Sequence, residues 1–143
     1  MAILSSATTI NQPVGKVFDF IVSPENHKSW QPMLQGAKVT PPGPVAVGSM
    51  YVYTTEVMGR QMETRTEVSQ FELNHKWATK TVGAPRSVET VYIFETDGNS
   101  TKLTISMDVP AGAYPAAAES MITQQMLESL EDQGKQLKQI LEK

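Results

Sequence analysis

Apolar and polar residues alternate along much of the chain between residues 50 and 109, which is the period of a strand with one buried face. Turn-forming residues interrupt the alternation at Gly59-Arg60, Gly83-Ala84-Pro85 and Asp97-Gly98-Asn99. Short strands joined by short turns predict an antiparallel meander. The expected strands in this region cover residues 51–57, 62–68, 77–81, 88–94 and 103–109.

The C-terminal part of the chain has the period of an α-helix instead. From about Ala116 to Lys143 the pattern predicts one helix of about 28 residues, which would be about 42 Å long. Gly134 falls on its apolar side, where it lowers helix stability by about 1 kcal/mol relative to alanine. We expect this glycine to allow close approach to the sheet. The apolar arc of the helix consists of Ile122, Met126, Leu127, Leu130, Leu137, Ile140 and Leu141.

The first 40 residues predict two short helices between two further strands. Pro13 suits the first turn of a helix, where its missing N–H costs nothing. Ser23 and Pro24 then supply a capping residue and a first position for a second helix. The expected elements are a strand over 2–10, a helix over 14–22, a helix from Ser23 to about Trp30, and a strand over 34–40.

The composition fits a single domain and argues against several classes of site. A chain of 143 residues can bury about two-thirds of its surface without disulfides or a structural metal. It has no cysteine and only two histidines, His27 and His75, so we expect no thiolate nucleophile, metal site or other cofactor. Its 15 acidic and 12 basic residues are not clustered, which argues against binding to nucleic acid or to a membrane surface. No apolar run is long enough for membrane insertion, and the N-terminus does not resemble a secretory signal, so we expect a cytoplasmic protein.

Two motifs near the N-terminus carry a resemblance to a known family. They are PVGKVFDFI at 13–21 and SPENH at 23–27, followed by Trp30, and Val47-Gly48-Ser49 enters a strand further along. With the order of elements, they resemble the START/polyketide cyclase-like superfamily (also called SRPBCC, and including the birch-pollen-allergen-like proteins). The small bacterial polyketide cyclase/dehydrase-like branch is the most similar.

This resemblance covers residues 1–143 as one domain and implies an α+β helix-grip fold. In that fold a seven-stranded curved antiparallel sheet wraps around the long C-terminal helix, with two short helices between strands 1 and 2. The resemblance also implies a cavity between the sheet and the helix that takes a hydrophobic or aromatic small molecule, lipid- or polyketide-like.

The residues themselves favour a cavity, because the inner face of the expected sheet combines aromatic rings with threonine hydroxyls. A dry core would leave such hydroxyls unsatisfied at about 1–3 kcal/mol each, whereas a ligand pocket needs scattered polar groups. The alternative is that threonine is simply a good strand residue whose hydroxyl bonds locally. The expected cavity residues are Trp30, Met33, Tyr51, Tyr53, Thr64, Thr66, Trp77, Thr79, Thr90, Tyr92, Phe94, Ile122, Thr123 and Met126.

A few residues allow more than one interpretation. Glu119 falls on the apolar arc of the long helix, where it could act as a base or complement the helix N-terminus. Trp30 could gate the pocket or pack the short helices onto the sheet. His27 is expected at the surface or as a capping residue.

Three functions remain open at this point. The first is binding of a hydrophobic small molecule without chemistry. The second is a polyketide cyclase/dehydratase-type enzyme that uses the same cavity, with Tyr53 and Glu119 as weak catalytic candidates and no catalytic motif. The third is a chaperone-interaction module, as in the Hsp90-ATPase-activator branch of this superfamily. A homodimer is also left open.

Overall fold

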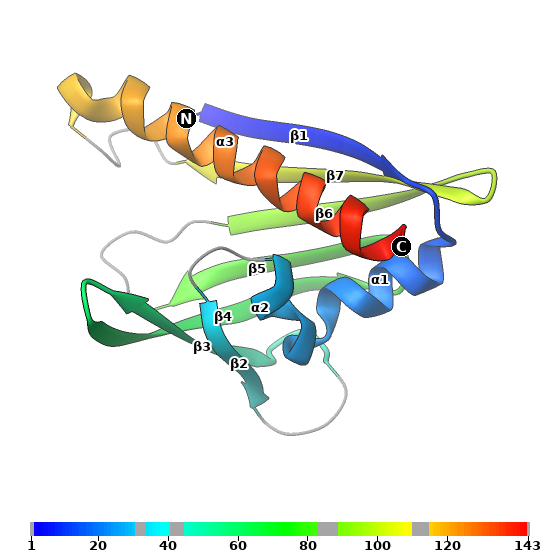
Figure 1. Cartoon of the computed structure of the whole chain (residues 1–143), viewed down its shortest axis with the longest axis horizontal. Coiled ribbons are helices and arrows are strands. Elements are labelled where there is room, and N and C mark those ends of the chain that lie inside the picture. Colours follow the sequence, from blue (N-terminus) through cyan, green and yellow to red (C-terminus); the bar gives the residue numbers. More distant parts are fainter. Residues whose placement is uncertain (1, 31–33, 41–44, 83–88, 110–114, 143) are drawn as a thin grey trace.

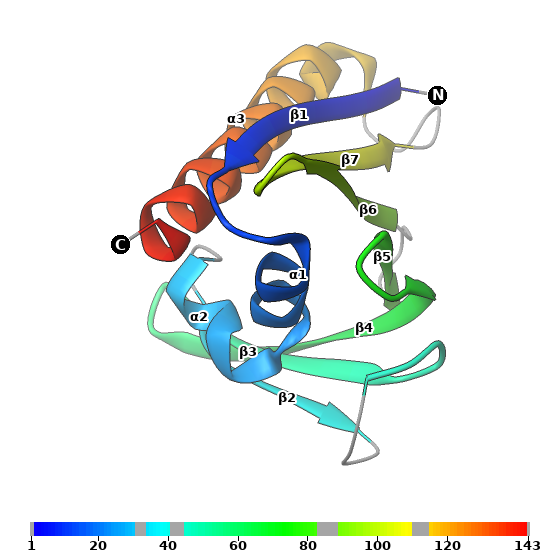
Figure 2. The ribbon, with the colours of Figure 1, turned by 90° about the vertical axis from the view of Figure 1, so that its right-hand side faces the viewer.

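A computed structural model describes residues 2–30, 34–40, 45–82, 89–109 and 115–142. Seven strands form one sheet in the order β1-β7-β6-β5-β4-β3-β2, and all neighbouring strands are antiparallel. The sheet curls strongly around its concave face (Figure 2). The expected curved antiparallel sheet is therefore confirmed. Its strands are β1 (Ala2–Ile10), β2 (Leu34–Thr40), β3 (Met50–Val57), β4 (Arg60–Glu72), β5 (Lys76–Val82), β6 (Glu89–Asp97) and β7 (Ser100–Val109).

The turn between β3 and β4 lies one residue earlier than the sequence suggested. Val57 pairs with Arg60, so Met58 and Gly59 form a two-residue loop. Both have positive φ angles, 53° and 79°, which is what the tightest hairpin turns require. Glycine adopts this conformation at little cost, whereas Met58 adopts it because the strand register demands it.

Helical segments between β1 and β2 close one end of the curved sheet. Helix α1 (Val14–Val22) buries Val17, Phe18, Ile21 and Val22. The segment expected as a second helix is a 3-10 turn, η1 (Pro24–Asn26), continued by the single turn α2 (His27–Trp30). The Ser23 hydroxyl donates back to the Asp19 carbonyl at 2.7 Å, so this residue ends α1 instead of capping a new helix.

The long C-terminal helix α3 (Ala116–Leu141) lies along β1 on the concave side of the sheet (Figure 1). Leu130, Leu137 and Leu141 are buried against the core. The close approach expected at Gly134 is confirmed, because a Cβ atom at this position would lie 2.7 Å from the Thr8 hydroxyl oxygen. The helix is therefore packed most tightly onto β1, near one edge of the sheet.

We expect the cost of a side chain at Gly134 to depend on Thr8. In the native background, Gly134→Ala should leave the free energy of unfolding unchanged or lower it, because the clash offsets the gain in helix propensity. In a Thr8→Ala background the same change should stabilise the protein by up to about 1 kcal/mol. Urea denaturation of the four proteins measures this coupling, and an equal effect in both backgrounds would contradict it.

The two ends of the chain are held together by hydrogen bonds from β1 and the residues after it to the end of α3. Lys138 Nζ donates to the Thr9 carbonyl at 2.8 Å, and Gln12 Nε2 donates to the Leu141 carbonyl at 2.6 Å. The backbone N–H of Asn11 donates to the Glu142 carboxylate at 2.9 Å. Hydrogen bonds from Lys138 and then from Asn11 lower the pKa of Glu142.

Candidate functional site

The concave side of the sheet holds a pocket of about 190 Å³, which we call the inner pocket. The strand register brings its wall together, since Thr66 pairs with Thr81, Thr79 with Thr90, and Thr90 with Met107. These pairs lie on one face of β4 to β7, and α3 adds a side chain from above. The lining consists of Tyr53, Thr66, Trp77, Thr79, Thr81, Thr90, Tyr92, Met107 and Gln133.

Aromatic rings pack around one side of the inner pocket. The rings of Tyr51 and Tyr53 stack with centroids 5.9 Å apart and planes within 2° of parallel. Trp77 lies 4.7 Å from Tyr92 and meets Tyr51 edge-on at 5.6 Å. Edge and offset contacts of this kind add to the energy of area burial and hold the rings in fixed positions. The pocket therefore has a firm aromatic wall.

His27 lies beneath this wall and is completely buried, so the expectation of a surface or capping residue was wrong. Its ring packs against Trp30, Tyr51, Tyr53 and Trp77 at centroid distances of 5.0 to 5.7 Å. The reason is the turn η1, which directs the first side chain of α2 inward toward β3. Desolvation by burial lowers the pKa of His27 to about 4, although the hydrogen bond to Ile21 acts in the opposite direction.

The hydrogen bonds of His27 assign its tautomer. Nε2 lies 2.7 Å from the Ile21 carbonyl oxygen, which only accepts, so Nε2 carries the proton. In the neutral ring Nδ1 must then accept, and the Tyr53 hydroxyl 3.0 Å away donates to it. The chain of hydrogen bonds runs from the pocket-lining Tyr53 through His27 to the backbone of α1.

Two more tyrosine hydroxyls near the pocket also donate to fixed acceptors. Tyr51 donates to the Val22 carbonyl at 2.6 Å, and Tyr92 donates to Gln133 Oε1 at 3.2 Å. Burial, and then the repulsion that an ionised Tyr53 would exert on a neighbouring phenolate, raises the pKa of both well above that of free tyrosine. The Trp77 N–H acts on Tyr51 in the opposite direction but lacks hydrogen-bond geometry. The tyrosines therefore stay neutral and act as hydrogen-bonding groups.

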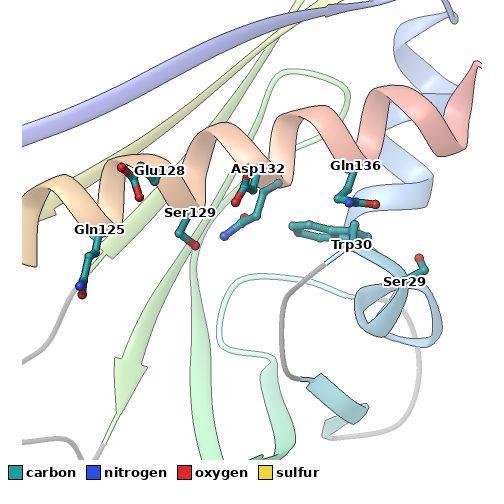
Figure 3. Close-up of a pocket in the computed structure, with 8 residues that line it drawn as sticks. Ser29, Trp30, Gln125, Glu128, Ser129, Asp132 and Gln136 are labelled. Atoms are coloured by element: carbon teal, nitrogen blue, oxygen red, sulfur yellow. The ribbon is translucent and has the colours of Figure 1, made fainter.

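A second hollow of about 630 Å³, which we call the outer crevice, lies between α2 and α3 (Figure 3). Trp30 lies at the end of α2, with Gln136 of α3 next to it. The Trp30 side chain is only 2% exposed, and its indole N–H has no hydrogen-bond partner among the described residues. The crevice is lined by Ser29, Trp30, Gln125, Glu128, Ser129, Asp132, Gln133 and Gln136.

The residues expected to line one cavity are distributed over several places. The structure brings six of them together at the inner pocket, namely Tyr53, Thr66, Trp77, Thr79, Thr90 and Tyr92. Trp30 lines the outer crevice. Tyr51 is buried within the aromatic wall but does not line the pocket, and Phe94 packs in the core with its ring centroid 5.0 Å from that of Phe18.

The other expected cavity residues lie away from both hollows or outside the described residues. Thr64 is exposed on β4. Ile122, Thr123 and Met126 are half-buried on the N-terminal half of α3 and line neither hollow, because α3 follows β1 near the sheet edge. Met33 lies outside the described residues. The backbone of Glu119 belongs to α3, but its side chain is not among those described.

The expected cavity residues lack three polar residues of the site, His27, Thr81 and Gln133, of which Thr81 lies on the same alternating face as Thr79. Gln133 follows Leu130 by three positions and precedes Leu137 by four, so helical spacing could have placed it on the buried arc. No comparable signal marks His27, because it stands where η1 passes into α2 and no period applies there.

Metal-binding clusters and membrane-spanning helices are both absent from the described part of the chain. Among the described residues, no group of three or more histidine, aspartate or glutamate side chains could hold a metal ion. None of the helices described is both long and apolar enough to cross a membrane.

Comparison with known proteins gives a family match and several structures of the same fold. The family model described as polyketide cyclase/dehydrase and lipid transport matches residues 1–142. A search of curated proteins finds no significant match.

Solved structures resemble the chain over nearly its whole length. A START superfamily protein from Mycobacterium smegmatis has a TM-score of 0.74 at 17% identity, with 98% of this chain and 97% of that chain covered. The protein TTHA0849 from Thermus thermophilus has a TM-score of 0.73 at 13% identity, covering 96% and 95%. The Polyketide_cyc-like protein Cgl2372 from Corynebacterium glutamicum has a TM-score of 0.68 at 18% identity, covering 97% and 88%. At these identities the structures establish a shared fold.

Proposed function

The chain belongs to the polyketide cyclase/dehydrase and lipid transport family, within the START/SRPBCC superfamily, and we propose that it binds a hydrophobic or aromatic small molecule in the inner pocket. The observation that carries the proposal is the composition of this pocket. Three aromatic side chains, Tyr53, Trp77 and Tyr92, meet a group of threonines there. Apolar walls with a few converging polar groups are typical of small-molecule sites.

The polar groups of the inner pocket favour a ligand that is not a pure hydrocarbon. Thr66 and Thr79 are each 7% exposed and line the pocket, so a ligand there would face hydroxyls that gain from hydrogen bonding. Gln133 accepts from Tyr92 through Oε1, and its amide nitrogen is a donor suited to a carbonyl or ether oxygen. We infer an apolar ring or chain that carries oxygen atoms.

Binding without chemistry is favoured over the cyclase/dehydratase alternative. The acid–base pair that we identify among the described residues is Tyr53, which lines the inner pocket, with His27 behind it. Efficient general bases have pKa values near the working pH, whereas the pKa of His27 is about 4. This histidine is better suited to holding Tyr53 in position than to accepting its proton.

A neutral fluorescent probe, N-phenyl-1-naphthylamine, tests the proposal. We expect the wild type to enhance its fluorescence and hydrophobic metabolites to displace it. Thr90→Phe should weaken binding at least 30-fold, because the added ring fills a pocket of about 190 Å³. Thr96→Phe is the matched control, since Thr96 is exposed near the end of the same strand. No enhancement by the wild type, or equal affinity in Thr90→Phe, would contradict the proposal.

A further inference from the structure

The inner pocket by itself is small for a ligand of ordinary size. Small-molecule sites usually enclose about 300–1,000 Å³. The inner pocket, at about 190 Å³, lies below this range, whereas the outer crevice, at about 630 Å³, lies within it. Gln133 lines both spaces, so they meet at this residue of α3.

Trp30 lies between the outer crevice, which it lines, and Tyr92 of the inner pocket, and we call its ring the partition. On its inner side the ring meets the edge of Tyr92, a lining residue of the inner pocket, at 6.0 Å, and that of His27 at 5.3 Å. On its other side it lines the outer crevice (Figure 3). Its buried N–H has no partner among the described residues, so rotation of the indole would break no hydrogen bond described there. Within the described part of the chain, the partition is held closed by packing contacts.

We propose that the outer crevice is the outer half of the binding site, and that a ligand displaces Trp30 to join it to the inner pocket. This inference rests on the proposed function and adds the route and extent of the site. The joined space would fall within the usual range for small-molecule sites. It would take an elongated molecule, with an apolar part among Tyr53, Trp77 and Tyr92 and a polar end beside α3.

The charges of the side chains that line the crevice determine which polar group of a ligand can bind there. Its described lining contains the carboxylates of Glu128 and Asp132, the amides of Gln125 and Gln136, and no basic side chain. Glu128 also accepts a hydrogen bond from Gln124. An anionic end would be repelled by two carboxylates, whereas an uncharged or cationic end would find acceptors. The ligand class is therefore an amphipathic molecule whose polar end is uncharged or cationic.

Binding kinetics distinguish a partition from an ordinary wall residue. In stopped-flow mixing with N-phenyl-1-naphthylamine, Trp30→Ala should raise both the association and the dissociation rate constants at least tenfold, with a smaller change in Kd. Trp30→Phe, which keeps a ring of smaller size, should raise both by less. If only the dissociation rate rises, Trp30 is a contact within the pocket and the proposal is overturned.

A blocked crevice gives an independent test in case Trp30→Ala does not fold. Because the chain has no cysteine, Ser129→Cys can be labelled uniquely with a bulky maleimide. Ser129 lines the crevice, whereas Thr96 is exposed on β6, so labelled Thr96→Cys is the control. The label at position 129 should slow probe association at least tenfold, and the label at position 96 should not. Equal rates would overturn the crevice as the route while leaving binding in the inner pocket intact.

The charge of the probe tests the polar end. The sulfonated analogue 8-anilino-1-naphthalenesulfonate has the same rings and one negative charge. We expect its Kd for the wild type to be at least tenfold higher than that of the neutral probe. In the double variant Glu128→Gln/Asp132→Asn, the ratio of the two Kd values should be severalfold smaller. An unchanged ratio would overturn the assignment of the polar end to the crevice. If the wild type binds neither the neutral nor the anionic probe, both this inference and the proposed function are overturned.

Discussion

Lowering the pH from 7 to 4 is expected to reduce the free energy of unfolding by about 3 kcal/mol through His27 alone. In the unfolded chain the histidine has its ordinary pKa of 6.5, whereas burial lowers the pKa to about 4 in the folded protein. Between these values the unfolded state binds a proton that the folded state does not. The stability that depends on neutral His27 is therefore fully present above pH 6.5 and is lost as the pH falls toward 4.

Urea denaturation at several pH values measures this effect. His27→Phe should be less stable than the wild type at pH 7, because the Ile21 carbonyl and the Tyr53 hydroxyl lose their partner. Between pH 6.5 and 4, however, its stability should decline less steeply. His75 is exposed in a turn, so His75→Gln serves as the control and should keep the wild-type slope. Carboxylates titrate in all three proteins, and equal slopes for His27→Phe and the wild type would contradict the prediction.

Truncation of Trp77 is expected to lower stability by about 3–5 kcal/mol and at the same time to enlarge the inner pocket. The indole is 1% exposed and lies between Tyr51, Tyr92 and the pocket. Its removal should leave a cavity continuous with the existing space. A hydrophobic probe that fills this cavity should restore part of the lost stability, because binding to the folded state alone stabilises it.

Phe18→Ala provides a matched comparison for Trp77→Ala. Phe18 is also 1% exposed, but its ring meets Phe71 at 5.4 Å and Phe94 at 5.0 Å, neither of which lines the inner pocket. We expect a similar loss of stability, about 3–5 kcal/mol, without a gain in probe binding. Urea denaturation with and without N-phenyl-1-naphthylamine compares the two. The same rescue in both variants would show that the probe binds any cavity and would contradict a specific pocket at Trp77.

Much of the fold could be predicted because its signals are local. Alternation along β4 and β7, the turn at Gly98 and the apolar arc of α3 each depend on a few neighbouring residues. The segment from Ser23 to Trp30 is different. A serine followed by proline suits a helix start, but the Ser23 hydroxyl bonds to Asp19 and the chain forms η1 instead. The conformation of this segment depends on how the preceding helix ends, and the spacing of apolar residues does not predict that.

The site was harder to predict because it depends on how far α3 covers the sheet. Alternation placed Thr66, Thr79 and Thr90 on the concave face, and these residues line the inner pocket. It placed Thr64 there as well, yet Thr64 is exposed because α3 follows β1 and leaves this end of β4 uncovered. The burial of His27 depends on rings from β3 and β5, which lie far away in sequence. Such long-range packing leaves no trace in a local pattern.

The pairing of β1 with β7 and α3 has a consequence for biosynthesis. β1 is translated about 100 residues before its neighbour in the sheet and the helix that covers it. At about 5–20 residues per second, the nascent strand waits roughly 5–20 s for its partners. During this interval the unpaired N–H and C=O groups of β1 are exposed on the ribosome, where they can pair with another chain and lead to aggregation. We therefore expect ribosome-bound chains that stop before β7 to be sensitive to protease along β1, and the finished protein to be resistant there.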